Sequence, residues 1–543
     1  MTSAANRELI VVTKSELDHT TMAAMAFSPL AAHAGLNEIL ATFGATISPV
    51  FRTLGEESPS LDATANIVHQ SRFVRVTAED SRLESIAALM NDHPEVSSAY
   101  IKPPVFAPIA PPPSADSAPA SSSFESRQGY LDAAPNGVDA RYAWTISGGK
   151  GDGIQVFDVE GAWNFSHEDL PATPGLVAGG VPDQASNPLS WVNHGSAVMG
   201  EIAGIQNSYG ITGISPQVKF NGVSHFPSSS TGSAWGSASA IQAAADRCRP
   251  GDIILLEMHR PGPAFNYQLR DDQKGYVAVE WWPDDFQAIR YATAKGVIVV
   301  EAAGNGAQNL DDPLYSQRPS ISPVVFPVGW TNPFVRANAD SGAILVGAGA
   351  PPSGHFGAAR SRLDFSNYGA SLDAQGWGRE VVSTGYGDLA GQPNPNALYT
   401  SQFSGTSSAS PIVTGSLACI QGMLKAAGKT LLTSTTARQL LRSTGSPEPD
   451  ITQRIGNLPD IRTMATQLSI GAGGGLSQYA DYLKQVLYYS RWYPPLQGCL
   501  RSQICGGNSS GTCIPQHQQI VNDVAKVLTK CPPSYKSWFC QNL

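Results

Sequence analysis

The stretch from Phe403 to Leu424 constrains this chain more than any other. A turn of small residues, Gly405-Thr406-Ser407, leads directly into an apolar run from Ile412 to Ile420. The helical spacing of that run predicts a buried helix with Ser407 in its first turn. There the backbone N–H groups are unpaired and the helix dipole is positive. Ser407 is therefore a candidate nucleophile beside an oxyanion site, although the segment alone also fits a simple N-capping serine.

Three further segments each end in a side chain that suits this chemistry. Asp158 follows a short apolar strand, His194 enters an apolar helix, and Asn305 lies between two glycines after the strand Val297–Val300. Each residue alone has an ordinary explanation as a turn or core residue. Together, an acid, a histidine and a serine are the parts of an activated hydroxyl nucleophile, and Asn305 adds an N–H donor for the oxyanion.

The four motifs, which follow one another along the chain in the order Asp158, His194, Asn305 and Ser407, resemble those of the subtilases, the subtilisin-like serine endopeptidases. The matching segments are Gly405-Thr406-Ser407-Ser408-Ala409-Ser410-Pro411, His194-Gly195-Ser196-Ala197-Val198-Met199-Gly200, Ala302-Ala303-Gly304-Asn305 and the strand ending at Asp158. The resemblance implies peptide-bond hydrolysis through an acyl-enzyme on Ser407. It implies His194 as the base, Asp158 as the acid that orients it, and Asn305 with the Ser407 amide as the oxyanion hole.

The acid motif departs from the family pattern. It runs Asp158-Val159-Glu160-Gly161, where subtilases usually have Ser or Thr and then Gly after the acid. The loop to His167-Glu168-Asp169-Leu170 is also about two residues longer than is usual in that family. The related sedolisins use a glutamate, but they lack the histidine motif that is intact here. We therefore interpret Glu160 as a turn residue.

A second departure affects substrate binding. After Ile253–Glu257 the chain continues Met258-His259-Arg260-Pro261-Gly262-Pro263, where subtilases usually have a Ser-Leu-Gly-Gly segment that pairs with substrate. Backbone pairing needs only main-chain groups, but the two prolines remove donors. The resemblance thus implies a substrate-binding set that this sequence has altered: Met258, His259, Arg260, Gly262, Ala303 and Gly304.

The strand and helix pattern predicts an α/β catalytic domain over residues 127–465. Strands are expected at 154–157, 251–256, 297–300 and 324–328, with helices at 237–247 and 285–295 between them. This alternation predicts a mostly parallel sheet with helices on both faces, the subtilisin-like arrangement.

Residues 1–102 are predicted to form a small separate α/β domain. Strand patterns at 8–12, 72–76 and 96–101 alternate with helix patterns at 36–43 and 83–90. In this position the domain resembles a subtilase propeptide, which implies a folding chaperone and intramolecular inhibitor. Residues 103–126, rich in proline and serine, are the expected linker and the expected site of maturation cleavage.

Residues 466–543 are expected to form a separate cysteine-rich module. Five of the seven cysteines lie in this tail, which favours disulfides and an oxidising compartment; zinc is the competing interpretation, but no Cys-x-x-Cys pair is present. A helix is predicted from Tyr479 to Trp492. We expect Cys419, in the apolar run after Ser407, to be a buried free thiol.

Composition narrows the partners. A net charge of -9 argues against nucleic acid, and no apolar run reaches the roughly 18 residues that span a bilayer. Met22–Ala34 weakly resembles a signal-peptide cleavage region, but Pro29 interrupts it; secretion is favoured by the tail alone. No cofactor is required, and structural calcium is possible near Asp311-Asp312 without a fixed ligand spacing. A catalytically silent binding protein and a transpeptidase or macrocyclase remain the alternatives to a protease.

Overall fold

The computed structural model describes residues 7–15, 34–51, 70–108, 122–172, 174–182, 190–232, 235–470, 474–506, 513–529 and 533–543. The chain forms two compact units, Met1–Met464 and Ala465–Leu543, and each is described by itself. The possible signal region at Met22–Ala34 lies almost wholly outside the described residues.

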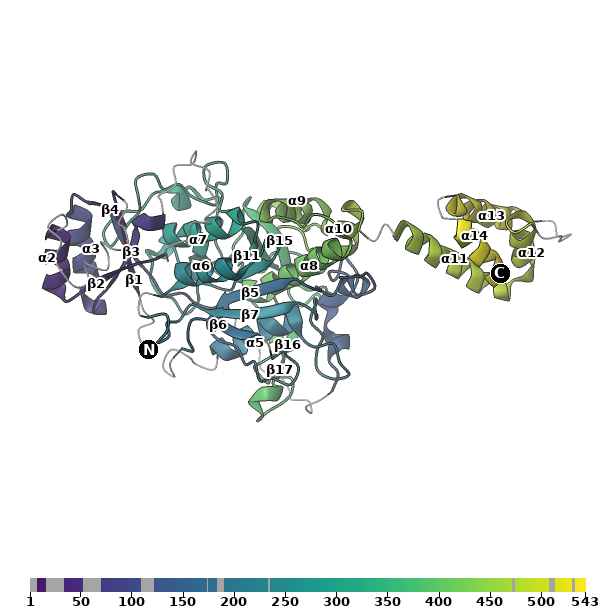
Figure 1. The fold of residues 1–543 in the computed structure, drawn as a ribbon, viewed down its shortest axis with the longest axis horizontal. Coiled ribbons are helices and arrows are strands. Elements are labelled where there is room, and N and C mark those ends of the chain that lie inside the picture. The colour runs from purple at the N-terminus through teal and green to yellow at the C-terminus, as the bar shows by residue number, and fades with distance from the viewer. Residues whose placement is uncertain are drawn as a thin grey trace. The chain divides into compact units, whose positions relative to one another are not determined.

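The first unit is built around a parallel sheet of seven strands (Figure 1). Every neighbouring pair in it is parallel. The spatial order is β15 (Leu372–Trp377), β14 (Ile344–Gly349), β11 (Ile298–Ala302), β8 (Ile253–Leu256), β5 (Gln155–Glu160), β7 (Lys219–Ser224) and β6 (Gly175–Ala178). The predicted α/β class with a mostly parallel sheet is confirmed. Helices cover both faces of the sheet, so its middle strand β8 is apolar throughout and the neighbouring strands β5 and β11 are almost wholly buried.

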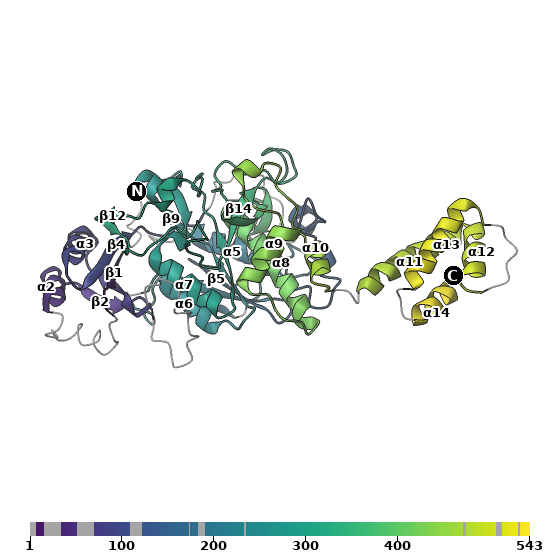
Figure 2. The same ribbon diagram turned by 90° about the horizontal axis from the view of Figure 1, so that it is seen from above.

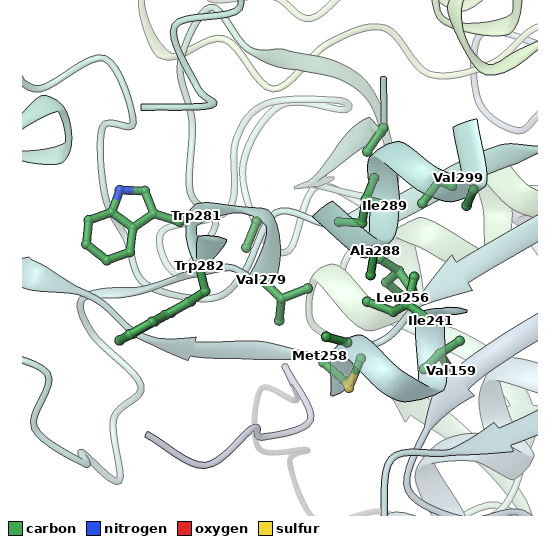
Figure 3. Packing of buried hydrophobic residues seen from close by; sticks show 14 of the residues in the cluster. Val159, Ile241, Leu256, Met258, Val279, Trp281, Trp282, Ala288, Ile289 and Val299 are labelled. Carbon is green, nitrogen blue, oxygen red and sulfur yellow. The ribbon is translucent and has the colours of Figure 1, made fainter. Parts of the chain in front are cut away.

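Alternation along the strands sends successive side chains to different helices. Val159 and Leu256 pack with Ile241 of α6 (Ser237–Arg247) and Ala288 of α7 (Pro283–Ala294), as Figure 3 shows. Asp158 and Glu160 therefore point to the opposite face. That face is covered by α5 (Ser190–Ala203), α8 (Thr406–Ala426) and α9 (Ser434–Thr444).

The N-terminal module, formed by the described residues up to 102, contributes four strands to a second, antiparallel sheet. The order of that sheet is β12 (Ser320–Ile321), β13 (Val324–Val325), β4 (Val96–Lys102), β1 (Glu8–Thr13), β3 (Phe73–Thr77) and β2 (Thr46–Pro49). The expected strand at 324–328 is therefore wrong as a member of the parallel sheet. The observed strand β13 is shorter than the expected one, and its residue Val324 pairs with Tyr100 of β4. Only the contact between two remote segments decides that pairing.

Both faces of this module are buried. Helices α2 (Ala34–Phe43) and α3 (Leu83–Asp92) cover the face that carries Leu9 and Val11 (Figure 2). The alternate residues Ile10 and Val12 belong to the core of the catalytic region. Tyr100 packs on the rings of Trp282 and Phe326 there, with ring centroids 6.2 and 5.2 Å away.

Buried ion pairs add to this contact. Lys102 Nζ lies 2.6 Å from Asp284 and 2.9 Å from Asp285, and all three side chains are fully buried.

Shorter elements complete the unit: α4 (Ala140–Ala143), β9 (His259–Pro261), β10 (Tyr276–Ala278), β16 (Val381–Thr384), β17 (Tyr399–Phe403) and α10 (Ile461–Gln467).

The second unit is helical. It contains α11 (Gly474–Trp492), α12 (Pro494–Gln503), α13 (Pro515–Leu528) and α14 (Pro533–Asn542). Leu483, Leu500, Val524 and Phe539 form its core. Disulfides join Cys499 to Cys513 and Cys505 to Cys540, as the clustering of cysteines predicts. Cys248 and Cys419 are buried free thiols, and Cys531 lies outside the described residues.

Candidate active site

Ser407 is the second residue of α8 and is fully buried. The residue before the helix, Gly405, has a φ of 104°, which favours glycine. A Cβ added to Gly405 would lie 1.9 Å from the Pro108 carbonyl oxygen and 3.2 Å from Asn305 Nδ2. The turn that presents Ser407 therefore has both a remote carbonyl and the Asn305 amide packed against it.

His194 is hydrogen-bonded to a glutamate. Its Nδ1 lies 2.6 Å from Glu160 Oε2, and both side chains are fully buried. Glu160 is the last residue of β5, and His194 is in the second turn of α5. A Cβ on Gly195 would lie 2.7 Å from Glu160 Oε1, so the absence of a side chain at 195 leaves room for the long glutamate.

Asp158 occupies a different position from the one predicted. Its Oδ2 accepts a 2.8 Å hydrogen bond from Trp163 Nε1, whereas the imidazole bonds Glu160. The interpretation of Glu160 as a turn residue is wrong, because Glu160 belongs to β5 and pairs with Ser224. Because Asp158 and Glu160 lie two residues apart on one strand, both face α5, and the longer, later side chain contacts His194.

A signal for this arrangement is present in the sequence. If the acid is Glu160 instead of Asp158, the apparent two-residue excess before His167-Glu168-Asp169-Leu170 disappears. The excess length is therefore a sequence signal that favours Glu160 over Asp158 as the partner of His194.

The two carboxyls interact directly. Asp158 Oδ1 and Glu160 Oε1 are buried and accept no donor among the described residues. Burial and the neighbouring Glu160 raise the pKa of Asp158 well above its usual value. Burial also raises the pKa of Glu160, and the hydrogen bond with Asp158 partly offsets that effect. One proton shared by the pair, held mainly by Asp158, satisfies both oxygens and leaves Glu160 to accept from His194.

The His194 imidazole is neutral in this environment. Burial lowers its pKa to about 3, so near neutral pH it holds a single proton. With that proton on Nδ1, facing Glu160, its Nε2 is free to act as a base. Nε2 of His194 and Oγ of Ser407 are both buried without a hydrogen-bond partner in the described part of the chain. Nε2 of His194 and Oγ of Ser407 are thus both available for a hydrogen bond, but they do not form one with each other in this structure.

Asn305 is fixed at the start of α8. Its Oδ1 accepts from the Thr406 N–H and Oγ1 at 3.0 Å each, and its backbone N–H donates to His259 Nδ1 at 3.2 Å. Its Nδ2 donates to Gln273 Oε1 at 3.2 Å. The side-chain amide is therefore held beside the nucleophile turn with its N–H group directed away from Thr406.

The end of the N-terminal module lies in this site. Phe106 and His259 exchange two backbone hydrogen bonds of 3.1 Å, which adds Phe106 as a short antiparallel strand beside β9. Gln273 Nε2 donates to the Ala107 carbonyl at 3.1 Å. Pro108, the next residue, is buried with its carbonyl against Gly405.

The other residues expected to bind substrate have varied surroundings. Met258 is in the core. The Arg260 guanidinium bonds the Pro103 carbonyl, Glu8 and Ser237, so it holds the N-terminal module. Gly262 donates its N–H to Gly275, while the carbonyls of Ala303 and Gly304 accept from Asn367. Within the segment 258–262, His259 is the residue whose backbone N–H and carbonyl are hydrogen-bonded to those of Phe106.

No cluster of three or more metal-ligand side chains occurs within the described ranges. No helix in those ranges has the length and apolar composition to span a bilayer.

The sequence profile of the subtilase family matches residues 88–458. The chain is 28% identical to subtilisin DY of Bacillus licheniformis over 279 residues, which is 50% of this chain and 78% of the relative. It is 28% identical to thermitase of Thermoactinomyces vulgaris over 309 residues, 56% of this chain and 85% of the relative. Among solved structures, fervidolysin of Fervidobacterium pennivorans matches with a TM-score of 0.49 and 16% identity, covering 85% of this chain and 61% of fervidolysin.

Proposed function

Because this chain belongs to the subtilase family of serine proteases, we propose that it is an endopeptidase with Ser407 as nucleophile and His194 as base. Protein or peptide chains are the proposed substrates. Attack by Ser407 forms an acyl-enzyme, which water then hydrolyses. The Ser407 amide, at the helix N-terminus, and Asn305 Nδ2 are the proposed donors to the oxyanion.

We assign the acid of the triad to Glu160 in place of Asp158. The 2.6 Å contact between Glu160 and His194 Nδ1 supports this assignment, since the acid must fix the imidazole tautomer. Asp158 becomes the proton-sharing partner of Glu160.

The observation that carries the proposal is that the chain's own segment Phe106–Pro108 lies in the site as a substrate would. It pairs by backbone hydrogen bonds with His259, and its last described carbonyl, at Pro108, lies against Gly405 near Asn305 Nδ2. Strand addition is a common way for proteases to bind extended peptides. We therefore propose that residues 1–102 are an inhibitory propeptide, and that maturation cuts the bond after Pro108, within the expected linker 103–126.

Self-cleavage tests the function and the site together. The purified full chain is expected to release an N-terminal fragment ending at Pro108, identified by mass and by the new N-terminus. Ser407→Ala should remain whole. Ser509→Ala, a change in the cysteine-rich tail, should process normally. A Ser407→Ala chain that cuts itself at the wild-type rate would contradict the assignment of the nucleophile.

The disulfides of the second unit support an extracellular place of action, because such bonds persist in oxidising compartments. Structural calcium remains an expectation from the resemblance.

A further inference from the structure

A third carboxyl, that of Glu257, faces the nucleophile. Glu257 directly follows β8, and its backbone N–H donates to Val159 of β5 at 3.2 Å. Its side chain is fully buried. Ser410, three residues after Ser407 in α8, donates its hydroxyl to Glu257 Oε1 at 2.5 Å. The carboxyl is thus anchored to the first turn of α8 through one oxygen.

The other oxygen of the Glu257 carboxyl is left without a partner. Glu257 Oε2 is buried without a hydrogen-bond partner among the described residues, and so is Ser407 Oγ. The Ser407 side chain nevertheless lies close enough to hydrogen-bond with the Glu257 carboxyl, and that hydrogen bond by itself lowers the pKa of Glu257. Two buried polar atoms that lack partners destabilise the folded state. A single proton on Glu257 Oε2 gives both atoms a partner, because Glu257 then donates a hydrogen bond to Ser407 Oγ.

The surroundings favour that proton. The titratable groups that interact with Glu257 are carboxyls: Asp158 and Glu160 on β5 and Glu201 on α5. From α8 it meets the neutral hydroxyls of Ser407 and Ser410. Burial, and then the charge of Asp158, raise the pKa of Glu257 well above its usual value. An acid placed among other acids in a buried site keeps its proton to unusually high pH.

We propose, on the basis of the proposed function, that Glu257 is a further catalytic residue: its neutral carboxylic acid donates a hydrogen bond to Ser407 Oγ. The Ser407 hydroxyl proton is then free for His194 Nε2, which is also buried without a hydrogen-bond partner among the described residues. The serine is held between a donor on one side and a base on the other.

The proton balance closes over both half-reactions. In acylation, the Ser407 proton passes to His194 as the bond from Oγ to the carbonyl carbon forms, and His194 gives that proton to the amine as the C–N bond breaks. In deacylation, His194 takes a proton from water as the water oxygen bonds to the acyl carbon; the bond from that carbon to Oγ then breaks, and His194 returns the proton to Oγ. Glu257 keeps its own proton throughout and stabilises the charge that develops on the departing Oγ.

Two substitutions separate a neutral donor from a carboxylate base. Glu257→Gln keeps an acceptor for Ser410 and an N–H donor for Ser407, so turnover of a peptide ester is expected within about tenfold of wild type. Glu257→Leu removes the donor at similar volume and is expected to lower turnover by about 10²-fold, as loss of one preorganised donor does. Glu301→Gln, a buried acid on the neighbouring strand, is the control and should leave turnover unchanged.

The pH profile distinguishes a catalytic role from a structural one. Ionisation of Glu257 removes the donor, so wild-type turnover should fall at alkaline pH, and Glu257→Gln should lack that fall. Thermal unfolding of each variant shows whether it is folded. Wild-type turnover in folded Glu257→Leu, or a Glu257→Gln variant as impaired as Glu257→Leu, would overturn the proposal. Failure of the wild-type chain itself to react with a fluorophosphonate would instead contradict the proposed function.

Discussion

At the residue scale, two acids on one strand have separate tasks. Glu160 accepts from His194 at 2.6 Å, and Asp158 is bonded to Trp163 and shares a proton with Glu160. Changing Glu160 to Gln places an amide against Nδ1, favours the wrong imidazole tautomer and should lower turnover by about 10⁴-fold. Asp158→Asn still accepts from Trp163 and donates to Glu160, so its loss should be much smaller.

Comparing these two variants distinguishes the two acids, because each variant replaces a carboxyl by an amide of nearly the same shape and the two positions are only two residues apart. Steady-state turnover of a peptide ester measures each, and the rate of fluorophosphonate labelling reports the reactivity of Ser407 directly. If Asp158→Asn suffered the larger loss, Asp158 would be the acid of the triad, as the motif alone predicts.

At the element scale, α8 approaches the sheet so closely that one strand has no room for a side chain. A Cβ on Gly376 of β15 would lie 2.3 Å from the Ala409 carbonyl oxygen and 2.7 Å from its Cα, both backbone atoms in the first turns of α8. Gly376→Ala should therefore displace the start of the helix, lower stability by about 1–3 kcal/mol and reduce turnover. Thermal unfolding and ester hydrolysis measure the two effects.

Gly498 in α12 provides the matched control. Among the described residues, no atom outside the helix's own backbone and the two chain neighbours lies within 4 Å of a Cβ at that position, and alanine is the better helix former by about 1 kcal/mol. Gly498→Ala should therefore preserve activity and the stability of its own unit. Unchanged melting of Gly376→Ala would show that α8 has more freedom than its contacts imply.

At the scale of the whole first unit, the N-terminal module is held by buried charge. Lys102 lies within 2.9 Å of both Asp284 and Asp285, with no solvent exposure. Lys102→Met leaves two buried carboxyls without their cation, and removal of one partner from such a group costs about 3–5 kcal/mol. In an uncleaved Ser407→Ala chain, we expect earlier thermal unfolding and faster amide exchange in β1 and β4.

Arg82→Met is the control for that experiment. Arg82 pairs with Glu79 at 2.9 Å on the exposed side of the module, where an ion pair contributes about 1 kcal/mol or less. If both variants released the module equally, the ion pairs of Lys102 would not be what holds it.

The expected α/β fold could be predicted because its signals are local. The helix after Ser407 and the strands expected at 154–157, 251–256 and 297–300 follow from apolar periodicity within short windows, although the structure extends the first and last of these strands to Glu160 and Ala302. The helix predicted at 237–247 has those bounds in the structure. The segments with the candidate histidine, asparagine and serine could be located in the same way, as short motifs next to such elements.

The sequence by itself determined which segments form the sheet and which carry polar groups at its edge. The tertiary structure alone decided which acid meets His194, that Val324–Val325 joins the N-terminal sheet, and that Glu257 lies beside the first turn of α8. The physical reason is distance along the chain. Strand alternation gives Asp158 and Glu160 the same face, so only the placement of α5, more than 30 residues later, selects between them.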